Sequence, residues 1–488
     1  MRKGKTMNRR KFNMNYGKFI KNYRKTLILT LIFVLALTCC LAGCSSKSSG
    51  GEAGSSSPEQ DQSPKVLEGT IEDITNGTIA VKDEEGEIYY FQRDDSLVVS
   101  PDGILEIDRN IHVTYAGELE ESDNNVQDVE LISFYIEKAQ AEPANSGSGG
   151  HDSAEQRATE ILSSLTLEEK VGQMFIVRCP EKDAAGVASK YQFGGYILFA
   201  RDFKNYSREQ VKANISSYQN SAKIPMFIGV DEEGGTVNRV SLYTQFRAAP
   251  FLSPRELYNQ GGWSLIKSDT QEKAALPKSL GINLNFAPVA DVSTDQKDYM
   301  YQRSFGVSAE KTAEFVGTVV GVMRENNMGS VLKHFPGYGN NKDTHTGIAV
   351  DERSLESFRE SDFLPFKAGI EAGAPVVLVS HNIVKSIDAE RPASLSSAVH
   401  NILRKELNFD GLIITDDLYM DAIRQYTYGQ EAAVMAVMAG NDLLCCTDYE
   451  TQYPAVVEAV ESGRISQSRI DESVLRILKY KLEVGIIE

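Results

Sequence analysis

The sequence predicts a parallel (β/α)8 barrel of the TIM type, preceded by a small all-β domain. Two observations support this fold class. From about residue 154 to the end of the chain, short apolar runs alternate with helical stretches, whereas residues 66–139 alternate apolar and polar side chains in short runs. A chain of 488 residues, 41% of them hydrophobic, can bury one large core and still form a small second domain.

Eight short runs in the second part of the chain are candidate strands. Most are apolar throughout, which is typical of strands buried on both faces. Helical stretches, such as residues 354–372 and 431–439, lie between them, and eight strands with intervening helices give a closed barrel. The alternative is a doubly wound open sheet, but no glycine-rich phosphate loop follows the first strand. The eight runs are residues 173–178, 195–200, 225–231, 282–289, 330–334, 375–381, 411–416 and 442–447.

The alternating runs of residues 66–139 predict a small β-barrel or sandwich. Asn76-Gly77 and Glu85-Gly86 are turn signals between runs. The runs are residues 70–74, 78–82, 88–91, 111–115 and 129–136.

Segments rich in small and polar residues flank this β domain. Residues 44–65 predict a flexible tether and residues 140–153 a linker, because neither has enough apolar surface to offset the entropy of ordering. The barrel domain, residues 154–488, begins with an amphipathic segment, after which Thr166 and Glu169 form a capping-box pattern.

Residues 1–43 predict a lipoprotein signal peptide. Residues 1–25 contain ten Lys or Arg and no acidic residue, and an apolar run follows at residues 26–41. That run, of about 16 residues, is shorter than the roughly 20 that a spanning helix needs. It ends in Leu41-Ala42-Gly43-Cys44, which resembles the bacterial lipobox. We therefore expect a lipid on Cys44 and a chain tethered to the outer face of the cytoplasmic membrane; an uncleaved anchor is the alternative.

Cleavage before Cys44 would make the chain more acidic. The formal net charge is −17, and loss of the ten basic residues of the leader gives −27. Such a chain is a poor partner for nucleic acid. Besides Cys44, the cleaved chain keeps Cys179, Cys445 and Cys446, which we expect to be buried core thiols.

Ionisable residues gather at the ends of the predicted strands, where the active site of a (β/α)8 barrel lies. The chain has six histidines, yet His334, His345 and His381 all fall at or just beyond strand ends. Zinc is an alternative use of these histidines, but no His-x-His or His-Glu-x-x-His pair is present, so we expect no metal or other cofactor. The other strand-end candidates are Arg201, Asp202, Asp231, Glu232, Glu233, Asp291, Lys333, Ser380, Asp416 and Asp417.

The stretch KHFPGYGNNKDTH, residues 333–345, resembles the catalytic loop of family 3 glycoside hydrolases of the β-N-acetylglucosaminidase branch. The resemblance implies that His345 is the acid/base and that Asp343, two residues earlier, orients it. The chemistry is sound in itself, since a carboxylate beside an imidazole orients the ring and favours its charged form.

The run GLIITDD, residues 411–417, is a second segment that resembles this family, and the resemblance implies that Asp416 is the nucleophile. Successive residues of a strand point to opposite faces, so Asp416 and Asp417 cannot both face the barrel axis. We expect Asp417 to have a structural role.

Further segments that look like the family extend the resemblance over nearly all of residues 165–488. By this matching, Asp231, Arg303, Lys333 and His334 should bind sugar hydroxyls, a task that suits charge-assisted hydrogen bonds. The alternative is salt bridging around the rim. Two departures from the family pattern concern substrate preference: Tyr338 replaces a histidine common in the loop, and Thr236 an arginine.

The resemblance implies an exo-acting, retaining β-N-acetylglucosaminidase (β-N-acetylhexosaminidase) that removes terminal β-linked GlcNAc, and the expected location suggests peptidoglycan fragments as substrate. A β-glucosidase is an alternative on the same scaffold. A glycoside phosphorylase is another, because a histidine donor does not repel phosphate. A sugar- or wall-binding lipoprotein is the non-enzymatic alternative. We expect a monomer.

Overall fold

The computed structural model describes residues 64–75, 77–83, 85–93, 98, 99, 107, 109–119, 126, 127, 129–136, 150–344, 347–427 and 431–487. The predicted leader, Cys44, Asn76 and His345 lie outside the described residues. The chain divides into Met1–Glu59 and Gln60–Glu488, and only the second unit contains described residues. Within them, no helix is both long and apolar enough to cross a membrane.

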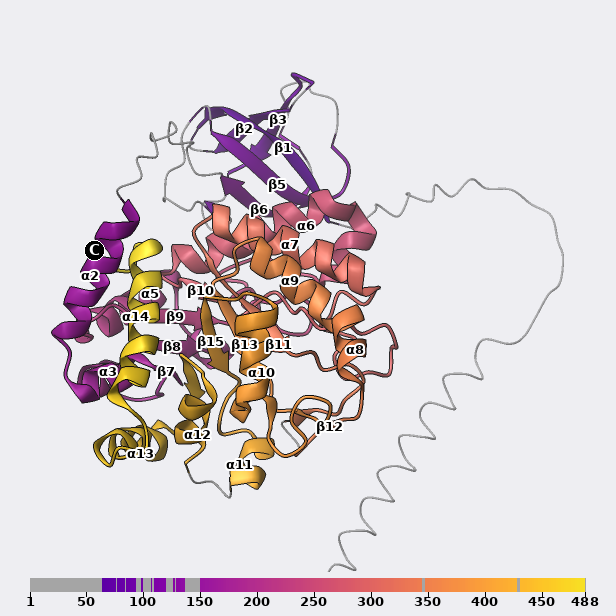
Figure 1. Ribbon diagram of the computed structural model, residues 1–488. Helices are drawn as coiled ribbons and strands as arrows, with labels where there is room; N and C mark the ends of the chain where they lie inside the picture. The colour runs from indigo at the N-terminus through magenta and orange to yellow at the C-terminus, as the bar shows by residue number, and fades with distance from the viewer. Residues whose placement is uncertain are drawn as a thin grey trace, which may run out of the picture. The chain divides into compact units, whose positions relative to one another are not determined.

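A parallel eight-stranded sheet forms the centre of the second unit (Figure 1). Its strand order is β15-β13-β11-β10-β9-β8-β7-β16, and a parallel bridge between Ile414 and Leu443 links the two outer strands. Each strand coincides with one of the predicted runs, so the (β/α)8 barrel is confirmed. The strands are β7 (Phe175–Arg178), β8 (Gly195–Leu198), β9 (Phe227–Val230), β10 (Leu284–Asn285), β11 (Gly329–Phe335), β13 (Val376–Val379), β15 (Leu412–Thr415) and β16 (Leu444–Cys446).

The barrel strands are mostly apolar because both of their faces are covered. Apart from Arg178, every residue of these eight strands is buried. Close packing also needs small residues at particular places. A Cβ on Gly229 of β9 would lie 2.6 Å from the Phe286 ring, so only glycine fits there without displacing the ring.

Helices surround the strands, and several begin at side-chain caps. The predicted capping box is confirmed: Thr166 Oγ1 accepts from the Glu169 N–H at 3.3 Å, and Glu169 Oε2 accepts from the Thr166 N–H at 2.9 Å. The helices are α2 (Gly150–Ser163), α3 (Leu167–Gln173), α4 (Ala184–Tyr191), α5 (Arg208–Ser221), α6 (Pro254–Ser279), α7 (Ala309–Glu325), α8 (Leu355–Ser357), α9 (Phe363–Glu371), α10 (Ser397–Asn401), α11 (Asp421–Thr427), α12 (Ala432–Ala439), α13 (Tyr449–Glu461) and α14 (Gln467–Glu483).

The predicted helix over residues 354–372 is interrupted. A π-helical turn, Phe358–Asp362, separates α8 from α9. Pro365 has no N–H to donate to the carbonyl of Ser361, four residues earlier, and its ring would crowd that carbonyl. A wider turn at this place relieves the conflict.

The β domain contains six strands in the order β3-β2-β1-β5-β6-β4. Its core includes Ile71, Val81, Phe91, Val113 and Phe134. The predicted runs all correspond to strands, but β4 was not predicted, because a strand of two residues leaves no alternating pattern. The strands are β1 (Pro64–Ile74), β2 (Thr78–Lys82), β3 (Ile88–Gln92), β4 (Val98–Val99), β5 (Asn110–Ala116) and β6 (Glu130–Ile136).

The three cysteines in the described part of the chain are free and buried, as predicted. Cys445 and Cys446 lie on β16, and Cys179 directly follows β7. Burial raises the pKa of the Cys179 thiol to about 12, so it is protonated at neutral pH.

Candidate active site

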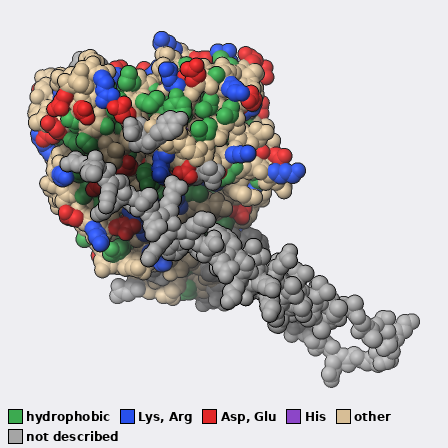
Figure 2. All heavy atoms as spheres, turned by 90° about the horizontal axis from the view of Figure 1, so that it is seen from below, with side chains coloured by type: hydrophobic (Ala, Val, Ile, Leu, Met, Phe, Trp, Pro, Cys, Tyr) green, Lys and Arg blue, Asp and Glu red, His purple; other side chains and the backbone are tan. Residues whose placement is uncertain are grey.

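Charged side chains meet at the C-terminal ends of the barrel strands. Seen from the side on which β12 (Val350–Asp351) and α11 lie, acidic and basic side chains surround a hollow in the surface (Figure 2). The C-terminal part of β11 carries the predicted Lys333 and His334, and the segments that follow β9, β10 and β15 carry Asp231, Arg303 and Asp416. This is the position at which (β/α)8 barrels hold their active sites.

Two cations and two carboxylates form a compact cluster at this end of the barrel. Lys333 Nζ lies 2.7 Å from Asp231 Oδ1 and 2.5 Å from Glu233 Oε1. Arg303 binds Glu233 through two hydrogen bonds, from Nε at 2.9 Å and from an Nη at 2.7 Å. The structure thus brings the predicted Asp231, Arg303 and Lys333 together. Glu233 bridges the two cations, and Asp231 pairs with Lys333.

Glu233 is the residue of this cluster that sequence reasoning left without a role. Burial by itself favours the neutral carboxyl, but the cations Arg303 and Lys333 outweigh burial and hold the pKa of Glu233 well below its usual range. Glu233 is therefore an anion that fixes two cations at once. Its place two residues after Asp231, at a predicted strand end, was the available signal.

His334 is held by Asp291, which follows β10. His334 Nδ1 lies 2.7 Å from Asp291 Oδ2, and the His334 backbone N–H donates to the same oxygen at 3.1 Å. His334 Nε2 lies 3.3 Å from an Nη of Arg303. Because a guanidinium only donates, Nε2 accepts and Nδ1 carries the proton. Sequence reasoning gave Asp291 no role.

The start of the loop after β11 is tied to the same network. Asp291 Oδ1 accepts from the Tyr338 backbone N–H at 2.8 Å, and the Tyr338 hydroxyl lies 2.5 Å from Thr344 Oγ1. Asp343, beside Thr344, lies near Tyr299, and so does Arg303, because both charges act on that phenol. Burial raises the pKa of Tyr299, and the Asp343 carboxylate raises it further.

Asp416 and Asp417 differ in their contacts, as the alternation of the strand predicted. Asp417 accepts from the Thr447 N–H at 3.0 Å and from its hydroxyl at 2.5 Å, and so ties the end of β15 to the end of β16. Asp416 Oδ1 accepts from the Asp417 N–H at 2.8 Å. These contacts are those expected of a residue with a structural role. Burial raises the pKa of the Tyr338 phenol, and the charge of Asp416, which lies nearby, raises that pKa further.

Three other strand-end candidates have structural contacts. Asp202 accepts from the Phe199 N–H at 2.8 Å, and Arg201 pairs with Glu181. His381 is fully buried, with Nδ1 2.8 Å from Ser394 Oγ and Nε2 3.0 Å from the Asp417 carbonyl oxygen.

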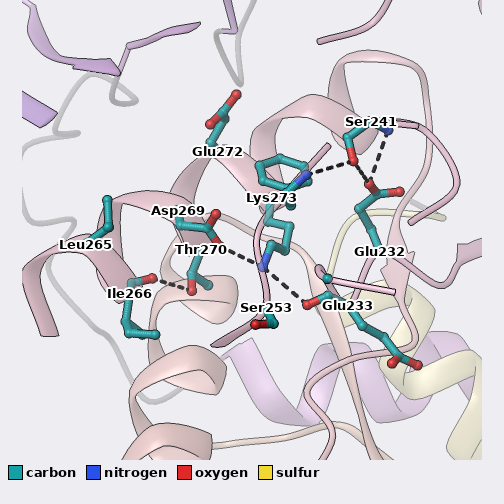
Figure 3. Close-up of polar contacts among 12 residues, drawn as sticks. Glu232, Glu233, Ser241, Ser253, Leu265, Ile266, Asp269, Thr270, Glu272 and Lys273 are labelled. Atoms are coloured by element: carbon teal, nitrogen blue, oxygen red, sulfur yellow. Dashed lines mark hydrogen bonds and ion pairs between the residues drawn. The ribbon is translucent and has the colours of Figure 1, made fainter. Parts of the chain in front are cut away.

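A buried polar layer supports the segment that carries Glu233 (Figure 3). Lys273 of α6 lies 2.6 Å from Asp269 and donates to the Glu233 carbonyl oxygen at 3.3 Å. Glu232, fully buried, accepts from the backbone N–H groups of Arg239, Val240 and Ser241. These contacts fix the backbone on both sides of the Glu233 side chain. Within residues 64–487 as described, no three His, Cys, Asp or Glu side chains are grouped as metal ligands.

A barrel with ionisable residues at its C-terminal rim is typical of an enzyme, and the comparisons give its family. Residues 166–480 match the family described as Glycosyl hydrolase family 3 N terminal domain, and the chain belongs to this family. It is a glycoside hydrolase that acts on O-glycosyl bonds.

Three similar proteins illustrate the match. Beta-hexosaminidase LpqI of Mycobacterium tuberculosis is 30% identical over 335 residues, which are 66% of this chain and 84% of that protein. A Beta-hexosaminidase of Nitrosomonas eutropha is 31% identical over 295 residues, 58% of this chain and 83% of the relative. A solved family 3 beta-N-acetylglucosaminidase from Paenibacillus sp. str. FPU-7 is 32% identical with a TM-score of 0.61, covering 66% of this chain and 63% of that one.

Proposed function

We propose that the protein is an exo-acting, retaining β-N-acetylglucosaminidase that removes terminal β-linked GlcNAc. The observation that carries the proposal is the meeting, at one end of the barrel, of a cluster suited to a sugar's hydroxyls and of Asp416. The named relatives, beta-hexosaminidases and a beta-N-acetylglucosaminidase, support the choice of sugar.

Asp416 is the proposed nucleophile. It attacks the anomeric carbon, and the bond to the leaving oxygen breaks, giving a glycosyl ester with the enzyme. Water then attacks the same carbon, releases the carboxylate and restores the configuration. The hydrogen bond from the Asp417 N–H to Asp416 Oδ1 orients the carboxylate and favours its charged form, which is the reactive one.

His345 is the proposed acid/base, with Asp343 as the group that orients it. His345 would give its proton to the leaving oxygen in the first step and take one from water in the second. The nearness of Asp343 to Tyr299, which Arg303 also influences, supports this assignment because Arg303 is a proposed sugar-binding cation.

Asp231, Arg303, Lys333 and His334 are the proposed sugar-binding residues. The carboxylate of Asp231 accepts from sugar hydroxyls, and the two cations donate to their oxygens. His334 Nε2, as an acceptor, suits a hydroxyl hydrogen. Because these groups are already fixed by Glu233 and Asp291, little side-chain entropy is lost when the sugar binds.

The assay uses aryl β-N-acetylglucosaminide and aryl β-glucoside, each with and without phosphate. We expect turnover of the first, with water as acceptor. Asp416→Asn should abolish turnover with an unchanged circular dichroism spectrum. The matched control is Asp417→Asn, which should lower Tm while folded protein keeps turnover within about tenfold. Unchanged turnover of His345→Ala would overturn the acid/base assignment.

We further propose that a lipid on Cys44 anchors the protein at the outer face of the cytoplasmic membrane. There it would act as a monomer on peptidoglycan fragments. The support is the sequence of the leader. Radiolabelled palmitate should label the full chain and not Cys44→Ser, whose product should be released from the membrane. Equal labelling of both would contradict the anchor.

A further inference from the structure

Tyr338 is fixed at both of its ends. Its backbone N–H donates to Asp291 Oδ1 at 2.8 Å, and its hydroxyl lies 2.5 Å from Thr344 Oγ1. Asp291 in turn holds the ring and the backbone of His334. Tyr338 therefore connects the ends of β10 and β11 to the residue that follows Asp343.

The ring of Tyr338 is equally constrained, with 2% of the residue exposed. The His334 ring meets it edge-on at 5.3 Å between centroids, and the Tyr299 ring lies tilted against it at 5.9 Å. Val289 and Met300 complete its buried apolar surroundings. A phenol packed in this way cannot change rotamer without displacing its neighbours, so the position of its hydroxyl is defined.

The backbone around Tyr338 explains why such a fixed point is needed. Gly337 and Gly339 both have positive φ, 118° and 53°, a region that glycine enters without steric cost. Neither has a side chain that could anchor the loop. Between these glycines, Tyr338 supplies the anchoring side chain.

We propose that Tyr338 is a positioning residue whose hydroxyl fixes Thr344, and through it Asp343, relative to the residues that hold the sugar. The inference rests on the proposed role of Asp343 and His345 in proton transfer. Tyr338 does not donate the proton itself, because burial and then the Asp416 charge raise the pKa of its phenol above the usual range. Its effect is confined to the placement of the donor segment.

The test compares two substrates that differ in their need for a proton. Dinitrophenolate leaves without protonation, whereas phenolate requires it, so a misplaced donor slows only the phenyl β-N-acetylglucosaminide. For Tyr338→Phe we expect kcat/KM to fall about tenfold on the phenyl substrate, equivalent to about 1.4 kcal/mol, and less than about threefold on the dinitrophenyl substrate. Equal losses on both substrates, or none, would overturn the proposal.

Two further variants address the same contact. Thr344→Val removes the partner hydroxyl and should show the same selective loss, and Tyr338→Phe should add little to it, because both changes break one interaction. If Tyr338→Phe fails to fold, Thr344→Val decides alone. Additive losses would overturn the proposal.

Controls separate this inference from general destabilisation and from the proposed function. Tyr196 is also fully buried, and its hydroxyl donates to the Ala184 carbonyl oxygen at 2.7 Å. Tyr196→Phe should lower kcat/KM equally for both substrates, or leave it unchanged for both. Asp343→Asn should show a selective loss; if it does and Tyr338→Phe does not, the positioning role fails alone. If Asp343→Asn shows none, the proposed donor fails.

Discussion

Replacement of Lys481 should stabilise the protein in a pH-dependent way. Lys481, on α14, is completely buried, and its Nζ donates to Gln173 Oε1 at 2.8 Å beside the Phe227 ring. Burial lowers the pKa of Lys481 from 10.5 to about 7. The unfolded chain therefore binds a proton between pH 7 and 10.5 that the folded chain does not, so stability rises with pH across this window.

The pKa shift gives the size of the effect. A pKa lowered from 10.5 to about 7 makes the charged Lys481 cost on the order of 5 kcal/mol at and below pH 7. Lys481→Met keeps the length of the side chain and removes that cost, but it leaves Gln173 Oε1 without its donor, at about 1–3 kcal/mol. The variant should thus be more stable than the wild type by about 2–4 kcal/mol at pH 6.

Urea unfolding at a series of pH values measures this difference. Between pH 7 and 9 the advantage of Lys481→Met should shrink by roughly 2 kcal/mol, because the wild type gains stability as folded Lys481 loses its proton. Lys479→Met is the matched control. Lys479 lies two residues before Lys481 on the same helix, but its side chain is 41% exposed, so this variant should show the same pH dependence of stability as the wild type. A gap between wild type and Lys481→Met that does not change with pH would refute the reasoning.

Two more predictions follow from the site and the core. Glu233→Gln should lower kcat/KM about 100-fold or more, chiefly by raising KM, because the amide cannot neutralise Arg303 and Lys333. An unchanged KM in Michaelis–Menten kinetics would contradict this prediction. In a chain that begins at Ser45, Cys179 and the two β16 cysteines should not react with a thiol reagent until urea unfolds the protein, since all three are buried and their pKa values are raised; rapid labelling of the native protein would contradict this.

Most of the barrel could be predicted from the sequence because its strands carry a local signal. A strand buried on both faces is mostly apolar, and the apolar run around β10 was recognisable although only Leu284–Asn285 forms the ladder. The interruption of the helix over residues 354–372 also had a local cause in Pro365, but propensity alone does not say whether a proline ends, kinks or widens a helix.

The site was only half predictable because its pairs are not local. Glu233 and Arg303 are 70 residues apart, Asp291 and His334 are 43 apart, and each pair meets only after the barrel has closed. A sequence gives the residue types at strand ends but not which carboxylate faces which cation. Glu233 and Asp291 therefore received no role, although both stand at predicted strand ends. The connection of Tyr338 to Thr344 depends on loop geometry that no local pattern encodes.

The sheet order bears on how such a site can hold one sugar. Asp231 and Glu233 carry two negative charges and Lys333 and Arg303 two positive ones, so the cluster offers directed hydrogen bonds and little net charge, which suits an uncharged sugar. β13 lies between β11, which carries Lys333, and β15, which precedes Asp416. Two strand spacings amount to roughly 10 Å, enough for one pyranose ring between the cations and the nucleophile. One ring could thus contact the cations and the nucleophile at the same time, as the proposed function requires.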